Sequence, residues 1–104
     1  MSKEFKSSIE RITYYEAILD RAADAARGLR DAIEAFEAAQ PLVRELAAYY
    51  GSAEWRRDFE DDEAGRLPPD LKRGVLSEDA VYDALSENDE LLLILREAKR
   101  ERER

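Results

Sequence analysis

Residues 8–50, SIERITYYEAILDRAADAARGLRDAIEAFEAAQPLVRELAAYY, decide the fold of this chain. Apolar residues recur there at alternating spacings of three and four, which is typical of one face of an α-helix. We call these positions the apolar seam, and Gln40 is the one polar residue among them. The seam consists of Ile12, Tyr15, Leu19, Ala22, Ala26, Leu29, Ile33, Phe36, Gln40, Val43, Ala47 and Tyr50. The pattern predicts one long helix over residues 8–50.

The two ends of this helix carry start and stop signals. Ser7 and Glu10 have the spacing of a capping box, and Gly51-Ser52 is suited to end one helix and cap the next. Pro41 lies inside the pattern and removes a backbone donor. Because the seam keeps its register across Pro41, we predict a kinked, continuing helix, with a true break at Pro41 as the alternative.

The rest of the chain predicts two more helices and a connector. Residues 53–63 form a short helix that carries Trp55, and residues 78–102 form the last helix, with Ser77 as its N-cap. The intervening segment is an ordered connector, with one helical turn after Pro69 and Gly74 as its exit. The predicted fold is all-α, a coiled-coil-like helical bundle in which the last helix returns antiparallel to the first.

Composition limits the classes of function. The chain has 104 residues, which make one domain over 1–104, with residues 1–6 and 101–104 frayed. It contains no Cys and no His, so disulfides, thiolate nucleophiles, zinc fingers and imidazole chemistry are excluded. We predict no cofactor. No apolar segment follows residues 1–6 as a secretory signal would require, so we expect a cytoplasmic protein. The longest apolar run is residues 91–95, which is too short to span a membrane, so we expect no membrane partner.

Charge is distributed unevenly along the chain. The formal net charge is −8, and residues 52–95 carry five basic against thirteen acidic groups. Nucleic-acid affinity depends on basic residues that neutralise phosphates, so we predict no nucleic-acid partner. A third function class, an acidic mimic of nucleic acid, is disfavoured because residues 1–51 and 96–104 are evenly mixed in sign.

An acidic cluster follows the tryptophan, and it comprises Asp58, Glu60, Asp61, Asp62 and Glu63. Its spacing departs from a calcium loop, since Glu63 stands where the turn needs glycine and Pro69 where a bidentate glutamate belongs. The cluster is therefore interpreted as a solvated helix end paired with nearby Arg and Lys residues, with a docking patch for a basic partner or a metal site as alternatives. Two Glu-x-x-Glu pairs, at 34–37 and 87–90, suggest a metal-dependent enzyme but lie on outward or flanking positions of their helices.

Helix length points to self-association. At ~1.5 Å per residue the first helix is roughly 65 Å long and the last is under 40 Å, so the last helix cannot cover all of the seam. An exposed apolar stripe is unfavourable, and a second copy of the chain would cover it. We predict a homodimer, with Ile12, Tyr15, Leu19 and Leu93 as interaction residues. Asp58, Glu60, Asp61 and Asp62 are the candidates for an unknown protein partner.

Several short motifs resemble a family of small bacterial helical domains of unknown function. They are Tyr49-Tyr50-Gly51-Ser52, Glu54-Trp55-Arg56, Asp61-Asp62-Glu63, Asp70-Leu71-Lys72-Arg73-Gly74-Val75-Leu76-Ser77-Glu78-Asp79 and Arg11-Ile12-Thr13-Tyr14-Tyr15-Glu16. The resemblance covers most of residues 9–95 and implies a short, mostly helical cytoplasmic bacterial protein without an assigned activity. It brings no catalytic or binding residues. Our functional hypothesis is a non-enzymatic helical interaction module, and the alternative is a divalent-metal-dependent hydrolase or nucleotide-handling enzyme that uses carboxylates.

Overall fold

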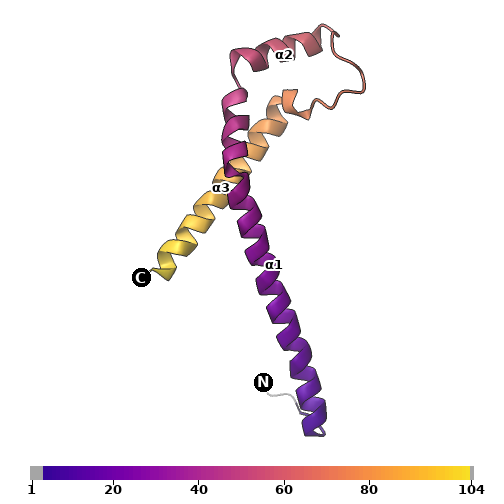
Figure 1. Ribbon diagram of the computed structural model, residues 1–104, viewed down its shortest axis with the longest axis vertical. Helices are drawn as coiled ribbons and strands as arrows, with labels where there is room; N and C mark the ends of the chain where they lie inside the picture. Colours follow the sequence, from indigo (N-terminus) through magenta and orange to yellow (C-terminus); the bar gives the residue numbers. More distant parts are fainter. Residues whose placement is uncertain (1–3, 104) are drawn as a thin grey trace. The chain divides into compact units, whose positions relative to one another are not determined.

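The computed structural model describes residues 4–103, which form helices joined by turns and an irregular connector, without a strand. In chain order the elements are α1 (Ser8–Tyr49), α2 (Ala53–Glu63), the short 3-10 helix η1 (Gly74–Leu76) and α3 (Glu78–Arg102) (Figure 1). The predicted all-α class, with a long first helix, a short helix that bears Trp55 and a C-terminal helix, is confirmed. The antiparallel return of α3 along α1 stays a prediction. The predicted fraying falls partly on residues 1–3 and 104, which lie outside the described residues.

The chain divides into two units that join between Gln40 and Pro41. The first unit contains α1 up to Gln40, and the second contains the end of α1 together with α2, η1 and α3. The prediction of one domain over residues 1–104 stays a prediction.

α1 begins at the predicted cap and continues through its proline. The Glu10 backbone amide donates a hydrogen bond of 3.2 Å to the Ser7 hydroxyl oxygen, which satisfies one of the free amides at the helix start. Pro41 lies inside the helix, so the continuing helix is confirmed and the alternative of a new helix that opens at Pro41 is wrong. The side chain of Gln40 donates to the Phe36 carbonyl oxygen at 3.0 Å, within the same turn that precedes the proline.

Two glycines and one serine lie at the ends of α2, the short helix between α1 and the connector. Gly51 has φ +83° and Gly65 has φ +72°, both in the left-handed region where a side chain is strained. The Ser52 hydroxyl accepts from the Trp55 amide at 3.0 Å and caps α2. α2 therefore has a glycine at each end, and its short length follows directly from the sequence.

The core of the second unit is small and centres on Trp55. Among residues 4–103 the buried hydrophobic side chains are Trp55, Leu76 and Val81. Trp55 stacks on Phe59 at a centroid distance of 5.3 Å, and its indole N–H donates to the Val75 carbonyl oxygen at 3.0 Å. That hydrogen bond ties α2 to η1 across 20 residues of chain, and burial of the ring supplies most of the apolar stabilisation there.

α3 begins as predicted. The Ser77 hydroxyl accepts from the Ala80 amide at 3.3 Å, and Glu78 and Asp79 lie in the first turn, where they stabilise the positive end of the helix dipole. Leu76 and Val81, which stand at the two positions of a hydrophobic staple around the Ser77 cap, are both buried.

The connector differs from its prediction. We predicted a helical turn after Pro69 that ends at Gly74; instead a tight turn closes from the Leu71 amide to the Pro68 carbonyl oxygen at 3.2 Å, and η1 begins at Gly74. The cause is Arg73, whose guanidinium donates to the carbonyl oxygens of Pro68 (2.6 Å) and Leu71 (3.3 Å) and forms an ion pair with Asp62 of α2. Arg73 therefore replaces helical hydrogen bonds with side-chain bonds and fixes the connector to α2.

Replacing Arg73 by Ala is expected to destabilise the second unit by about 2 kcal/mol, because the change removes a partly buried charged donor from Asp62 and two carbonyls. The measurement is urea unfolding followed by the fluorescence of Trp55. Arg66→Ala is the matched control: its pair with Asp61 is exposed, and its loss is expected to cost less than ~1 kcal/mol. Equal effects of the two substitutions would contradict the role given to Arg73.

Candidate functional site

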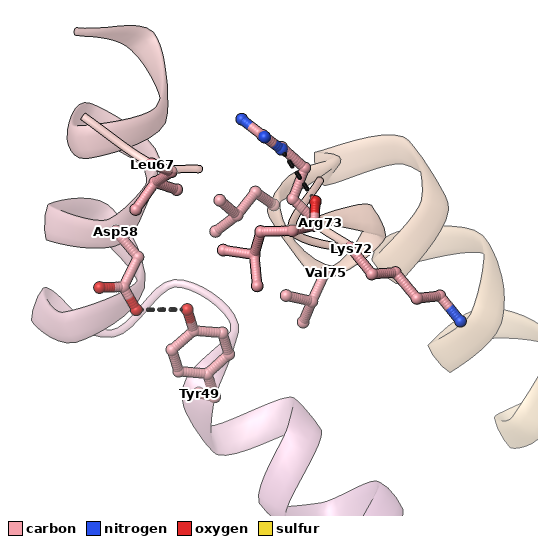
Figure 2. Close-up of a pocket in the computed structure, with 8 residues that line it drawn as sticks. Tyr49, Asp58, Leu67, Lys72, Arg73 and Val75 are labelled. Carbon is pink, nitrogen blue, oxygen red and sulfur yellow. Dashed lines mark hydrogen bonds between the residues drawn. The ribbon is translucent and has the colours of Figure 1, made fainter. Parts of the chain in front are cut away.

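A hollow of about 220 Å³ opens in the second unit between the end of α1, α2 and the connector (Figure 2). Four leucine and valine side chains make most of its wall apolar. Figure 2 shows Tyr49 and Asp58 together, with Leu67 beside Asp58 and with Lys72, Arg73 and Val75 on the opposite side. The lining residues are Tyr49, Asp58, Leu67, Leu71, Lys72, Arg73, Val75 and Leu76. This volume is below the usual range of ligand pockets.

Tyr49 and Asp58 form the polar contact of this hollow. The Tyr49 hydroxyl donates to a carboxylate oxygen of Asp58 at 2.5 Å (Figure 2). This hydrogen bond raises the pKa of Tyr49 to about 12, with further contributions from burial and from the negative charges of Asp58 and Glu54. A phenol that keeps its proton up to that pH does not act as a base or nucleophile near neutral pH, so the pair is a structural joint between α1 and α2.

The acidic cluster pairs largely with its own unit. Asp61 forms an ion pair with Arg66 at 2.8 Å, Asp62 pairs with Arg73, and Asp58 accepts from Tyr49. Glu60 is exposed. In the part of the chain that the structure describes, no three acidic side chains converge as a metal site would require. The cluster therefore matches the interpretation of a helix end whose acids pair with nearby basic residues.

The predicted interaction residues of α1 lie exposed on one face of the first unit. The exposed fraction is 59% for Ile12, 50% for Tyr15 and 60% for Leu19. No residue of α1 is buried. The ring of Phe5 contacts those of Tyr14 and Tyr15 at centroid distances of 5.3 and 5.8 Å, so Tyr15 has an aromatic partner within its own chain. This contact leaves Tyr15 half-exposed and the seam beyond it open.

A shallow, open depression lies further along the same face of α1. It is lined by residues of that helix alone: Ala26, Leu29, Arg30, Ile33, Glu34 and Glu37. Leu29 is 63% exposed there. The first unit thus presents an apolar surface with one basic and two acidic side chains at its border.

Leu93 lies apart from these residues in the sequence, on α3 in the second unit. Its side chain is 57% exposed, and that of its neighbour Ile94 is also exposed. No helix within residues 4–103 is both long and apolar enough to cross a membrane.

Sequence reasoning predicted that nearby Arg and Lys residues pair with the acids, without singling out Arg66 and Arg73, and it missed the joint of Tyr49 with Asp58. The available signal was geometric: Gly51-Ser52 forces a sharp corner between two helices, and Tyr49 and Asp58 lie on either side of it. Which face of each helix turns inward at that corner depends on tertiary packing around Trp55, which the local pattern does not encode.

Tyr49→Phe is expected to destabilise the second unit by about 1–2 kcal/mol at pH 7, because it removes a hydrogen bond to a charged acceptor. The folded chain holds the Tyr49 proton more tightly than the unfolded chain, so this contribution is complete below pH 10 and is lost as the pH rises through about 12. Absorbance titration at the tyrosinate band is expected to lose its step near pH 12 in this variant. Tyr82→Phe, on an exposed position of α3, is the control that retains the step. A tyrosinate step near pH 12 that persists in the Tyr49→Phe variant would contradict the assignment of the raised pKa to Tyr49.

Comparison with known proteins gives one match. No curated protein and no solved structure matches the chain. The profile of one family, described as a domain of unknown function (DUF4298), matches residues 12–97, a span that runs from the first turns of α1 through α2 and η1 to near the end of α3. The resemblance to a helical family of unknown function is thereby confirmed, and this chain belongs to the DUF4298 family.

Proposed function

We propose that this protein is a non-enzymatic helical interaction module that self-associates through the N-terminal part of the seam on α1. The observation that carries the proposal is the exposure of Ile12, Leu19 and Leu29 on a 42-residue helix without a buried residue. Monomeric soluble proteins rarely expose a continuous apolar stripe of this kind, and such stripes mark interaction surfaces.

The energy available from covering the stripe is large on the scale of protein stability. Full burial of one Leu or Ile side chain contributes ~1.5–3 kcal/mol, and each copy offers at least three. An isolated helix gains most of its stability from packing its apolar face rather than from propensity. Self-association would therefore stabilise the fold of the first unit and bind the two copies through the same contacts.

Two other surfaces are less suited to hold the copies together. Asp58, Asp61 and Asp62 already have partners within the second unit, which reduces the charge they offer to a basic protein. Leu93 belongs to a short exposed apolar patch on α3, which we assign to a protein partner or to a further contact between copies. The seam on α1 is longer than this patch and is the principal contact of the proposal.

Light scattering of the purified chain is expected to give twice the 12.0 kDa of one copy. The double substitution Ile12→Asp, Leu19→Asp is expected to give 12.0 kDa, because two charges on the seam would be buried without partners in the dimer. Circular dichroism of the same variant is expected to show reduced helix content, since the first unit loses its packing partner.

The matched control is Ala17→Asp, Ala38→Asp, which adds the same two charges on exposed positions of α1 away from the seam. This variant is expected to remain dimeric. A wild-type mass of one copy over the micromolar range would overturn the proposal, and dimers of the Ile12→Asp, Leu19→Asp variant would move the contact away from this part of α1.

The hydrolase alternative is separable by calorimetric titration with Mg²⁺, Mn²⁺ and Ca²⁺. Micromolar binding that is abolished by Glu60→Ala or Asp62→Ala would favour the enzyme over the interaction module. Asp62→Ala also removes the partner of Arg73, so Glu60→Ala, whose side chain is exposed, is the more decisive variant.

A further inference from the structure

The two borders of the seam on α1 differ in chemistry. One border repeats every seventh residue as Ile18, Ala25 and Ala32, and we call it the apolar flank. The other carries Glu16, Ala23, Arg30 and Glu37, and we call it the charged flank. Residues at these positions flank the core of a two-helix pair and determine the relative orientation of its helices.

Both flanks are open to a partner. Glu16, Ile18, Ala25, Arg30 and Ala32 are all exposed. Neither Glu16 nor Arg30 forms an ion pair with another residue between 4 and 103. The charged flank therefore offers one acidic and one basic group, fourteen residues apart, for contacts outside the chain.

Orientation determines which flanks meet. In a parallel pair each flank faces the opposite border of the other copy, which places Ala25 beside Arg30, Ala32 beside Glu37, and Arg11 beside Glu16 of the second copy. In an antiparallel pair each flank faces its own counterpart, so the apolar flanks pack on each other and the charged flanks meet on the other side. The antiparallel pair thus separates apolar from charged contacts.

We propose that two copies pair antiparallel along residues 12–36 of α1, with Glu16 of each copy bound to Arg30 of the other. This inference rests on the proposed self-association and names its geometry. In each layer of the core, a residue of one copy then packs against a residue of the other copy. The layers are Ile12 with Phe36, Tyr15 with Ile33, Leu19 with Leu29, and Ala22 with Ala26. The two-fold axis passes near Ala25, where small side chains on both copies allow the helices to approach closely.

Charge selects this register over its neighbours. A shift of the pairing by one heptad towards the C-terminus would place Glu16 opposite Glu37 of the second copy, which is repulsive. A shift the other way would pair Arg30 with Ile9 and shorten the overlap. Of these three antiparallel registers, the proposed one gives two attractive pairs between Glu16 and Arg30, related by the two-fold axis.

The shallow depression on α1 lies on the face that this register covers. It is lined by Ala26, Leu29 and Ile33, with Arg30, Glu34 and Glu37 at its border. In the proposed pair Ala26, Leu29 and Ile33 face Ala22, Leu19 and Tyr15 of the second copy, and Glu16 of that copy reaches Arg30.

Disulfide trapping tests the orientation, because the chain has no Cys of its own. The two single variants Tyr15→Cys and Ile33→Cys are mixed in equal amounts, allowed to exchange copies, and oxidised in a glutathione buffer. Non-reducing electrophoresis and intact mass are expected to show the mixed disulfide as the main product. Either variant alone is expected to cross-link only at the level of Asp31→Cys on the outer face, since like positions lie 18 residues, or ~27 Å, apart.

The outcomes distinguish the two proposals. Efficient cross-linking of Tyr15→Cys with itself would show a parallel dimer and overturn the antiparallel inference while leaving self-association intact. Background cross-linking in every sample, together with a wild-type mass of one copy, would overturn the proposed function itself.

A charge exchange tests the ion pair independently. Glu16→Arg and Arg30→Glu are each expected to weaken dimerisation about tenfold, as two attractive pairs become repulsive, and the double variant is expected to return to within threefold of wild type. In a parallel dimer Glu16→Arg would face Arg11 of the second copy, and Arg30→Glu would not rescue it. Asp31→Arg is the control and is expected to leave the dissociation constant unchanged. Failure of the double variant to recover would overturn the inferred pair.

Discussion

The apolar face of α1 is the constraint on which the structure of this protein depends. A helix in water is held mainly by the packing of its apolar side, yet α1 has 42 residues and none of them is buried. Its side chains are those of a core helix, with Ile12, Leu19 and Leu29 at seam positions. Within the first unit this face is exposed, and the physical cost of leaving it in water is the reason that our proposal includes a second copy.

The second unit buries apolar side chains within itself, but it buries only a few of them. Trp55, Leu76 and Val81 form its buried core, so each polar contact around them carries a large share of the total stability. Arg73 and Tyr49 illustrate this: one attaches the connector to α2, and the other joins α1 to α2 through Asp58. The acids that give the middle of the chain its negative charge are thus used to close a small fold, and their number alone says little about a basic partner.

The boundaries of the helices could be predicted because their signals are local. Ser7, Gly51, Ser52 and Ser77 each act within one turn, and the structure places a cap or a left-handed glycine at these positions. The connector could not be predicted in the same way, since its turn depends on Arg73 reaching Asp62 eleven residues earlier in the chain. The Tyr49–Asp58 joint was missed for the same reason: its geometry follows from how Trp55 packs, not from the residues beside it. The candidate interaction residues were predictable as an exposed stripe, whereas nothing local identifies the partner.

The composition of the seam separates affinity from specificity. Ala22 and Ala26 contribute little apolar area, so most of the attraction between two seams must come from the larger residues towards the ends, such as Ile12, Leu19 and Phe36. The small residues have a different effect, because they let two helices approach closely and so bring the charged flanks within reach of each other. Close approach also raises the cost of a wrong register, in which like charges would meet at short distance. In the proposed antiparallel pair, an alanine-rich centre with large residues on both sides therefore lowers the total area that the pair can bury but allows the charged flanks to approach closely.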